Sequence, residues 1–321
     1  MTAGVSVLIA AYNTAGYIRE AVDSALAQTG VPVEVIVVDD GSTDETASIL
    51  RSYGTRITFI AAPHRNAAST RNSAWKASSC EFVAILDGDD RLSAGAFGPK
   101  LELLAREPAV GVAYGDAKAI DEHGDPLHPI MCRHRLTGAD NPLESLVEAN
   151  LFAPHAALTR RSVLERLPYL HHEEIDLVAD WDLWLRVAGI TRFAYTGDMS
   201  AEYRQHAAMS TRTLAPEKSL RQTLNTLRRA FDVPGARTLP WCVRRAALAR
   251  MLLLALRLRS SNDVEMVLRL WNDIRDGSLP GRVLMKLART PGAVSLAGGA
   301  INTTLAVRRR LIRRALRQRE P

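Results

Sequence analysis

Three aspartates end an apolar segment of the sequence. The run Ala84–Leu86 is followed by Asp87, Asp89 and Asp90, with Gly88 between the first two. Carboxylates so close together repel one another unless a positive charge lies among them. A divalent cation is a small positive object that prefers oxygen ligands. The spacing therefore predicts a metal held against a diphosphate, and the alternative is a solvated acidic turn.

A second pair of aspartates, Asp39 and Asp40, ends the apolar run Val33–Val38. A carboxylate before a helix is favoured by the helix dipole, which explains one aspartate better than two. The other could accept a hydrogen bond from the ring N–H of a nucleotide base. Arg71 follows in a segment expected to be helical, where its planar guanidinium could hold phosphate or base oxygens. The alternative for Arg71 is an ordinary surface position.

Two further candidates lie in the second half of the chain. Asp180 begins a segment with helical spacing and is followed by Trp181 and Trp184. An aspartate half-removed from water beside aromatic rings has a raised pKa and can act as a base. The alternative is a helix cap with the tryptophans in the core. His206 is a lone histidine, and most lone histidines have a structural role.

The elements that must position these residues alternate along the first 90 residues. Apolar, β-branched runs predict strands at 5–11, 33–38, 56–61 and 81–86, with helical spacing between them. Such alternation is typical of a parallel sheet covered by helices on both faces. Ligands of these sheets lie beyond the carboxyl ends of the strands, where the aspartates follow. Further on, the pattern predicts strands at 110–114 and 156–159 and helices at 141–150 and 176–188.

The character of the chain changes near residue 214. Residues 215–321 hold 22 Lys and Arg against 7 Asp and Glu, whereas residues 1–214 hold 19 against 28. We therefore expect two regions, 1–214 and 215–321, that differ in charge. The second is rich in Arg and Leu, and its spacing predicts helices at 217–231, 241–259, 263–274 and 305–318. Three scattered cysteines and the lack of a basic leader favour a reducing, cytoplasmic setting.

Taken together, these residues resemble the family 2 inverting glycosyltransferases of GT-A fold. The resemblance covers about two thirds of the chain. It is carried by five motifs in family order: Val5–Asn13, Val38–Asp44, Leu86–Asp90, Asp180–Arg186 and Tyr203–His206. It implies an α/β fold with a Rossmann-like mixed sheet, the GT-A nucleotide-diphospho-sugar transferase architecture. A C-terminal α-helical extension would follow this domain.

The resemblance also implies roles for the candidate residues around the nucleotide. Tyr12 and Asp40 would contact the base, with Arg71 nearby. Asp87, the first aspartate of the Asp-Gly-Asp motif, would reach the ribose or the metal. The implied donor is a nucleotide-diphosphate sugar, with UDP the expected carrier.

Three residues remain for the metal and the chemistry. Asp89 and His206 would ligate Mg²⁺ or Mn²⁺ against the diphosphate, and Asp180 would be the general base. The implied reaction inverts the anomeric carbon as a hydroxyl of a glycan or lipid-linked acceptor attacks it. Ala179 stands where the family usually has a glutamate, so one supporting carboxylate is missing.

Two alternatives belong to other classes. One is a non-catalytic relative that binds nucleotide sugars and acts as a scaffold in polysaccharide or glycoconjugate synthesis. The other is a phosphohydrolase of the haloacid dehalogenase kind, which also has Asp-X-Asp after a strand. The motif comes early in such chains and is followed by a threonine that is missing here, so we disfavour this alternative.

The last residues form a basic segment. Between residues 305 and 319, seven arginines alternate with apolar residues, as in a helix that lies on an anionic membrane surface. Nucleic acid is disfavoured as a partner because aromatic residues are missing from the segment and the first region is acidic. The alternative is that this basic segment is a solvated tail that binds no partner. Since no run of about 20 apolar residues occurs, we expect peripheral association with the inner face of a membrane and no spanning helix.

Overall fold

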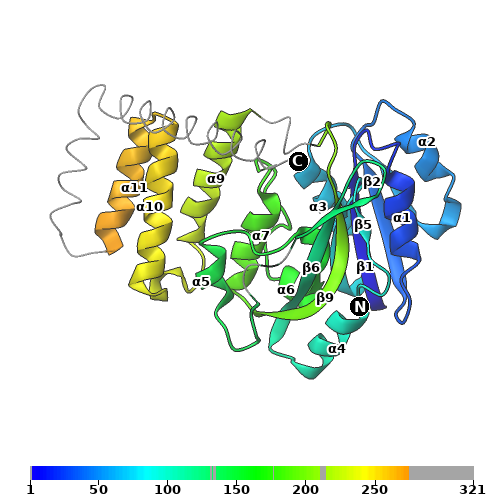
Figure 1. Cartoon of the computed structure of the whole chain (residues 1–321), viewed down its shortest axis with the longest axis horizontal. Coiled ribbons are helices and arrows are strands. Elements are labelled where there is room, and N and C mark those ends of the chain that lie inside the picture. Colours follow the sequence, from blue (N-terminus) through cyan, green and yellow to red (C-terminus); the bar gives the residue numbers. More distant parts are fainter. Residues whose placement is uncertain (1, 131, 133–134, 176, 210–214, 275–321) are drawn as a thin grey trace, which may run out of the picture. The chain divides into compact units, whose positions relative to one another are not determined.

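The computed structural model describes residues 2–130, 132, 135–175, 177–209 and 215–274 (Figure 1). The described residues divide into two compact units. The first comprises those of 1–213 together with 232–238, and the second those of 214–231 and 239–321. The first unit contains all the candidate site residues.

The first four strands form the parallel half of a sheet. They are β1 (Thr2–Ala11), β2 (Val33–Asp39), β3 (Thr58–Ala61) and β4 (Cys80–Asp87), in the spatial order β3-β2-β1-β4. All neighbouring pairs among them are parallel. The interior residues of β1 and β2 are buried on both faces, which is why each reads as a continuous apolar run. These four strands confirm the prediction from sequence.

The other half of the sheet is mixed. It contains β5 (Arg91–Leu92), β6 (Val110–Ile120), β8 (Ala157–Arg160) and β9 (Arg192–Arg204), and β7 (Pro126–Ile130) pairs with β6. Among the described residues the sheet has nine strands, and beyond β4 their order is β8-β6-β9-β5. Strand β8 is antiparallel to both β4 and β6, whereas β6 and β9 are parallel. The mixed sheet that the family resemblance implies is confirmed. The parallel sheet expected from the alternation of elements is confirmed up to β4 and is wrong beyond it.

Three helices cover one face of the sheet: α1 (Ile18–Leu26), α2 (Thr46–Arg51) and α4 (Gly98–Arg106). Alternate residues of β1, such as Val7 and Ile9, belong to one buried cluster with Ile18 and Val22 of α1 and Leu104 of α4. Because side chains of a strand alternate between faces, Leu8 points to the other side, where it is fully buried.

The opposite face is covered by α3 (Ala67–Ala77), which packs on β1 and β2. The helix begins after Asn66, whose side chain accepts a hydrogen bond from the amide of Ser69. Three shorter helices follow, namely α5 (Pro142–Leu146), α6 (Arg161–Leu164) and α7 (Ala179–Ala188). The helices expected at 141–150 and 176–188 are therefore shorter than predicted. Single 3₁₀ turns occur at Gly54–Arg56, Pro154–Ala156 and Ala236–Thr238.

The second unit is helical in its described part. It contains α9 (Pro216–Ala230), α10 (Trp241–Arg257) and α11 (Ser261–Ile274), with α10 packed against both of the others. All three were expected from the sequence, whereas the helix expected at 305–318 lies outside the described residues. Within the described part of the chain, every helix is too short or too polar to cross a membrane.

Candidate active site

The carboxyl ends of three parallel strands bring several predicted residues to one edge of the sheet. Asp39, the last residue of β2, pairs with Ala11, the last residue of β1. Asp87, the last residue of β4, pairs with Ala10 of β1. Tyr12 and Asp40 come next in the chain after β1 and β2. The structure therefore places Tyr12, Asp40 and Asp87 along one edge, as the alternation of elements predicts.

At the β2 end of this edge, Asp40 is held by the segment that follows β3. Asp40 is buried, and its Oδ1 accepts a hydrogen bond from the Arg65 amide at 2.9 Å. Its Oδ2 lies 3.0 Å from Nδ1 of His64. The His64 ring stacks on Tyr12 with 4.2 Å between ring centroids, and Tyr12 is 44% exposed. The exposed ring of Tyr12 thus lies next to the residues that hold the buried carboxylate of Asp40.

A cavity of about 240 Å³ adjoins this carboxylate. Its lining comes from the residue after β2, the segment after β3, and α3: Asp40, Ala62, Pro63, Arg65, Ser69, Thr70 and Ser73. His64 and Arg65 were not singled out from sequence. The sequence feature that could have indicated a role in the site is their position shortly after the strand predicted at 56–61.

Replacing Gly41 by alanine should destabilise this end of the site. Gly41 has φ +70°, and a Cβ there would lie 2.8 Å from the His64 amide nitrogen. We expect the free energy of unfolding, measured with urea, to fall by about 2 kcal/mol, from the left-handed backbone and the close approach together. Gly54→Ala is the control, because Gly54 has φ +57° with no atom within 4 Å of its Cβ position. Equal losses in both variants would mean that the contact with His64 has no effect.

At the β4 end, Arg71 of α3 forms an ion pair with Asp87. Burial alone would raise the pKa of Asp87, but the adjacent guanidinium lowers it below its ordinary value. Burial alone would lower the pKa of Arg71, and the charge of Asp87 reverses this. Nε of Arg71 is buried without a hydrogen-bond partner within the described structure. The pair is therefore charged, and one buried N–H of its guanidinium has no partner among the described residues.

Asp89 and His206 meet although 117 residues separate them. Nε2 of His206 lies 3.0 Å from Oδ2 of Asp89, and the ring of Tyr17 packs on that of His206. Burial and the charge of Asp87 raise the pKa of Asp89, while His206 opposes this shift. Gly88 lets the loop lie close to β1, because a Cβ on it would be 3.0 Å from a carbonyl oxygen of that strand.

These two side chains fit part of a metal site. An aspartate oxygen and a histidine nitrogen are both divalent-metal ligands, and they already converge. In the part of the chain that the structure describes, no three His, Cys, Asp or Glu side chains converge in this way. Asp87 is engaged by Arg71. A cation bound by Asp89 and His206 would need further oxygens, which a diphosphate could provide.

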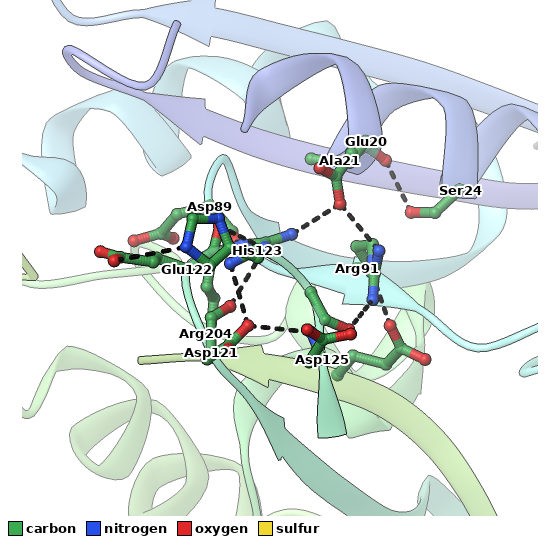
Figure 2. Close-up of polar contacts among 12 residues, drawn as sticks. Glu20, Ala21, Ser24, Asp89, Arg91, Asp121, Glu122, His123, Asp125 and Arg204 are labelled. Atoms are coloured by element: carbon green, nitrogen blue, oxygen red, sulfur yellow. Dashed lines mark hydrogen bonds and ion pairs between the residues drawn. The ribbon is translucent and has the colours of Figure 1, made fainter. Parts of the chain in front are cut away.

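Arg204, two residues before His206, ties the loop that carries Asp89 to three other segments (Figure 2). Its Nε donates to the backbone carbonyl of Asp89 at 2.8 Å, and Nη1 lies 3.2 Å from the carbonyls of Asp121 and Glu122. Its Nη2 pairs with Glu20 of α1 at 2.7 Å. The side chain is fully buried. Sequence reasoning included Arg204 in a motif but assigned it no role.

Figure 2 also shows Arg91 of β5, which shares Glu20 with Arg204. Arg91 pairs with Glu20 at 2.8 Å and with Glu202 of β9 at 2.5 Å. Asp90 adds a further link, since its Oδ1 accepts from the Arg204 amide at 2.7 Å. The ends of β4 and β9 are thus joined by several charged contacts.

The third aspartate of the motif, Asp90, points into the protein. Its Oδ2 lies 3.3 Å from Nδ1 of His155, whose side chain is fully buried. Burial and the charges of Asp89 and Asp87 raise the pKa of Asp90 well above its ordinary value. Burial lowers the pKa of His155 to about 4. Near neutral pH, His155 is therefore uncharged.

Asp180 lies in the first turn of α7, where the sequence predicts it. Its Oδ2 accepts a hydrogen bond of 2.7 Å from Nδ2 of Asn150. Burial raises the pKa of Asp180, and Asn150 and the charge of Arg71 oppose this. Arg71 and Asp87 both affect the ionisation of Asp180, because Asp180 lies at the same end of the site. Trp181 and Trp184 are both buried, as expected if the two tryptophans belong to the hydrophobic core.

Comparisons with known proteins identify the family and the fold of this chain. The model of the family described as glycosyl transferase family 2 matches residues 6–168. An uncharacterized glycosyltransferase of Rickettsia prowazekii is 28% identical over 210 residues, 65% of this chain and 66% of that protein. A chondroitin synthase of Pasteurella multocida is 29% identical over 200 residues, 60% of this chain. The chain thus spans about two thirds of the Rickettsia protein, and the synthase match covers 19% of the synthase.

Solved structures show the same fold. Staphylococcus aureus TarS 1–349 in complex with UDP-GlcNAc has a TM-score of 0.59 at 16% identity, covering 95% of this chain and 92% of that one. The mannosyltransferase PcManGT from Pyrobaculum calidifontis, in complex with GDP-Man and Mn²⁺, has a TM-score of 0.58 at 21% identity, covering 96% and 87%. These likenesses confirm the GT-A fold. Because the family model matches half of the chain, the chain belongs to glycosyl transferase family 2.

Proposed function

We propose that the protein is a metal-dependent, inverting glycosyltransferase that takes a sugar from a nucleotide-diphosphate sugar, with UDP the expected nucleotide. The acceptor would be a hydroxyl of a glycan or of a lipid-linked glycan. The observation that carries the proposal is the convergence of Arg71–Asp87, Asp89–His206 and Asp180 at one edge of the sheet. Complexes of structural neighbours with UDP-GlcNAc and with GDP-Man and Mn²⁺ support it.

Each pair would have a distinct task in binding. The Tyr12 ring and the Asp40 carboxylate would recognise the base, next to the cavity at Asp40. Asp87, fixed by Arg71, would accept hydrogen bonds from the ribose hydroxyls. Arg71 would act through this ion pair, by holding the Asp87 carboxylate in place.

The reaction needs a base and a way to neutralise the leaving diphosphate. Asp89 and His206 would hold Mg²⁺ or Mn²⁺, which supplies positive charge to the leaving group when it is bound. Asp180 would accept the proton of the acceptor hydroxyl as its oxygen attacks the anomeric carbon. A carboxylate with a raised pKa is suited to this task, because it holds the proton better than a solvated one.

Nucleotide sugars should stabilise the protein against heat in the presence of Mn²⁺. At a ligand concentration of 100 times Kd, the expected gain is about 2.7 kcal/mol. UDP-GlcNAc and GDP-mannose would be compared, each with and without Mn²⁺, by the thermal unfolding midpoint. Asp89→Asn is the control and should lose the Mn²⁺-dependent part of the gain. A midpoint that no nucleotide sugar moves, with or without metal, contradicts the proposed function.

We also propose that residues 1–214 are the transferase domain and that residues 215–321 are a basic helical region. The segment 305–319 of this region would bring the protein to an anionic membrane at the cytoplasmic face. The segment 305–319 lies outside the described residues, so this proposal rests on its composition. Vesicles containing anionic lipid should sediment with the full chain and less well with a chain that lacks 305–321. At about 1 kcal/mol for each cation near the surface, the loss should be large. Equal sedimentation of both chains would contradict this.

A further inference from the structure

Asn150 lies in the segment between α5 and the 3₁₀ turn at Pro154–Ala156, and it reaches Asp180 from 30 residues away. Its Nδ2 donates to Oδ2 of Asp180 at 2.7 Å. Its Oδ1 is buried and has no hydrogen-bond partner in the part of the chain that the structure describes. A carboxylate only accepts, so the contact itself requires the amide nitrogen to face Asp180. The orientation of Asn150 is therefore set by Asp180 rather than by a competing partner.

The residue directly before Asp180 provides no polar side chain. Ala179 is 2% exposed, and its carbonyl lies 3.2 Å from Nδ1 of His171. The helix terminus is thus tied to the loop before it through backbone, and the carboxylate of Asp180 is held from another segment. Two charged groups face it across the site, Arg71 of α3 and Asp87 of β4, with opposite effects on its ionisation.

We infer that Asn150 is a positioning residue for the base: its amide fixes one oxygen of Asp180 and favours the ionised form, which leaves the second oxygen for the acceptor proton. The inference rests on the proposed role of Asp180. An amide suits this position because it donates at every pH and carries no charge. A cation there would bind the carboxylate more strongly and weaken it as a base, and a second carboxylate would repel it.

The decisive variant is Asn150→Asp, which keeps the size of the side chain and replaces the donor by an acceptor. Asn150→Ala removes both. If Asn150 only fills space, Asp should be tolerated and Ala should not. If it positions Asp180, both should lower kcat by about 10- to 100-fold with the donor KM little changed. The acidic limb of the pH–rate profile should move to higher pH in both, and further in the aspartate variant.

A measurement without substrate tests the same point. In protein labelled with ¹³C-aspartate, the carboxyl resonance of Asp180 is assigned by its loss in Asp180→Asn and then titrated. Its pKa should rise in Asn150→Ala. Asn141→Ala is the matched control, because Asn141 caps α5 and its loss lowers stability without touching Asp180. An Asp180 titration that is the same in Asn150→Ala, Asn141→Ala and the unaltered protein overturns the inference.

The two hypotheses fail separately. If Asp180→Asn retains sugar transfer, the proposed base is wrong, whatever the titration of Asn150→Ala shows. If Asp180→Asn is inactive while Asn150→Asp has the kcat and pH profile of the unaltered protein, only the role of Asn150 is wrong. A raised pKa in Asn150→Ala together with loss of kcat in Asn150→Asp supports both.

Discussion

Replacing Asp180 by asparagine should lower kcat for sugar transfer by about 10²- to 10⁴-fold, the range of general acid–base catalysis. The amide has nearly the same shape, so the fold of α7 should persist, but it cannot accept the acceptor proton. The donor nucleotide should bind as before, because its proposed contacts lie at Tyr12, Asp40, Asp87 and the metal pair. Steady-state kcat and the donor KM, measured separately, check this.

Asp232→Asn is the matched control for this prediction, since Asp232 is an exposed aspartate of the same unit. It should leave kcat unchanged. The rate of the unaltered enzyme should also fall at low pH, because the base must be ionised and burial raises the pKa of Asp180. A variant at residue 180 that keeps both its rate and this pH dependence would exclude Asp180 as the base.

Replacing Arg204 by methionine should cause a large loss of stability in this unit. We expect the free energy of unfolding to fall by about 3 kcal/mol, the lower end for a broken buried ion pair, because Glu20 is 40% exposed. The backbone carbonyls of Asp89, Asp121 and Glu122 would lose their donor as well. Denaturation with urea, followed by circular dichroism, measures the change.

Arg91→Met provides the comparison, because Arg91 shares Glu20 but is 26% exposed and pairs mainly with other side chains. Its loss should cost about 1 kcal/mol. If the two variants lose equal stability, the backbone carbonyls held by Arg204 do not matter. We also expect Arg204→Met to weaken the Mn²⁺-dependent stabilisation by nucleotide, since Asp89 would no longer be anchored.

The parallel half of the sheet could be predicted because its signal is local. Strands β1, β2 and β4 are covered on both faces, so nearly every residue in them is apolar. Strand β9 could not be predicted in this way. Its buried residues recur neither at every second position, as in a half-buried strand, nor at the spacing of a helix, and it contains Gly197. The partners on each side of β9 hold it in the sheet, and they lie far away in sequence.

The same reasoning explains the outcome for the site. Asp40, Asp87 and Asp89 follow strands directly, and this placement singles them out. Asn150 and Arg204 follow no strand of the predicted half, and their partners are 30 and 115 residues away. A polar side chain whose partner lies so far away in the sequence leaves no spacing for a pattern to detect. The predicted roles of the site residues remain predictions until the variants are measured.

The position of β9 has a consequence for synthesis on the ribosome. The sheet from β3 to β4 can pair once residue 87 has emerged, but β9 lies between β6 and β5 and completes the other half. Asp89 meets His206 only after a further 117 residues. At about 5–20 residues per second, this takes on the order of ten seconds. During that interval the nascent chain has the edge that carries Tyr12, Asp40 and Asp87 but lacks His206, so the Asp89–His206 pair can form only after β9 has been made.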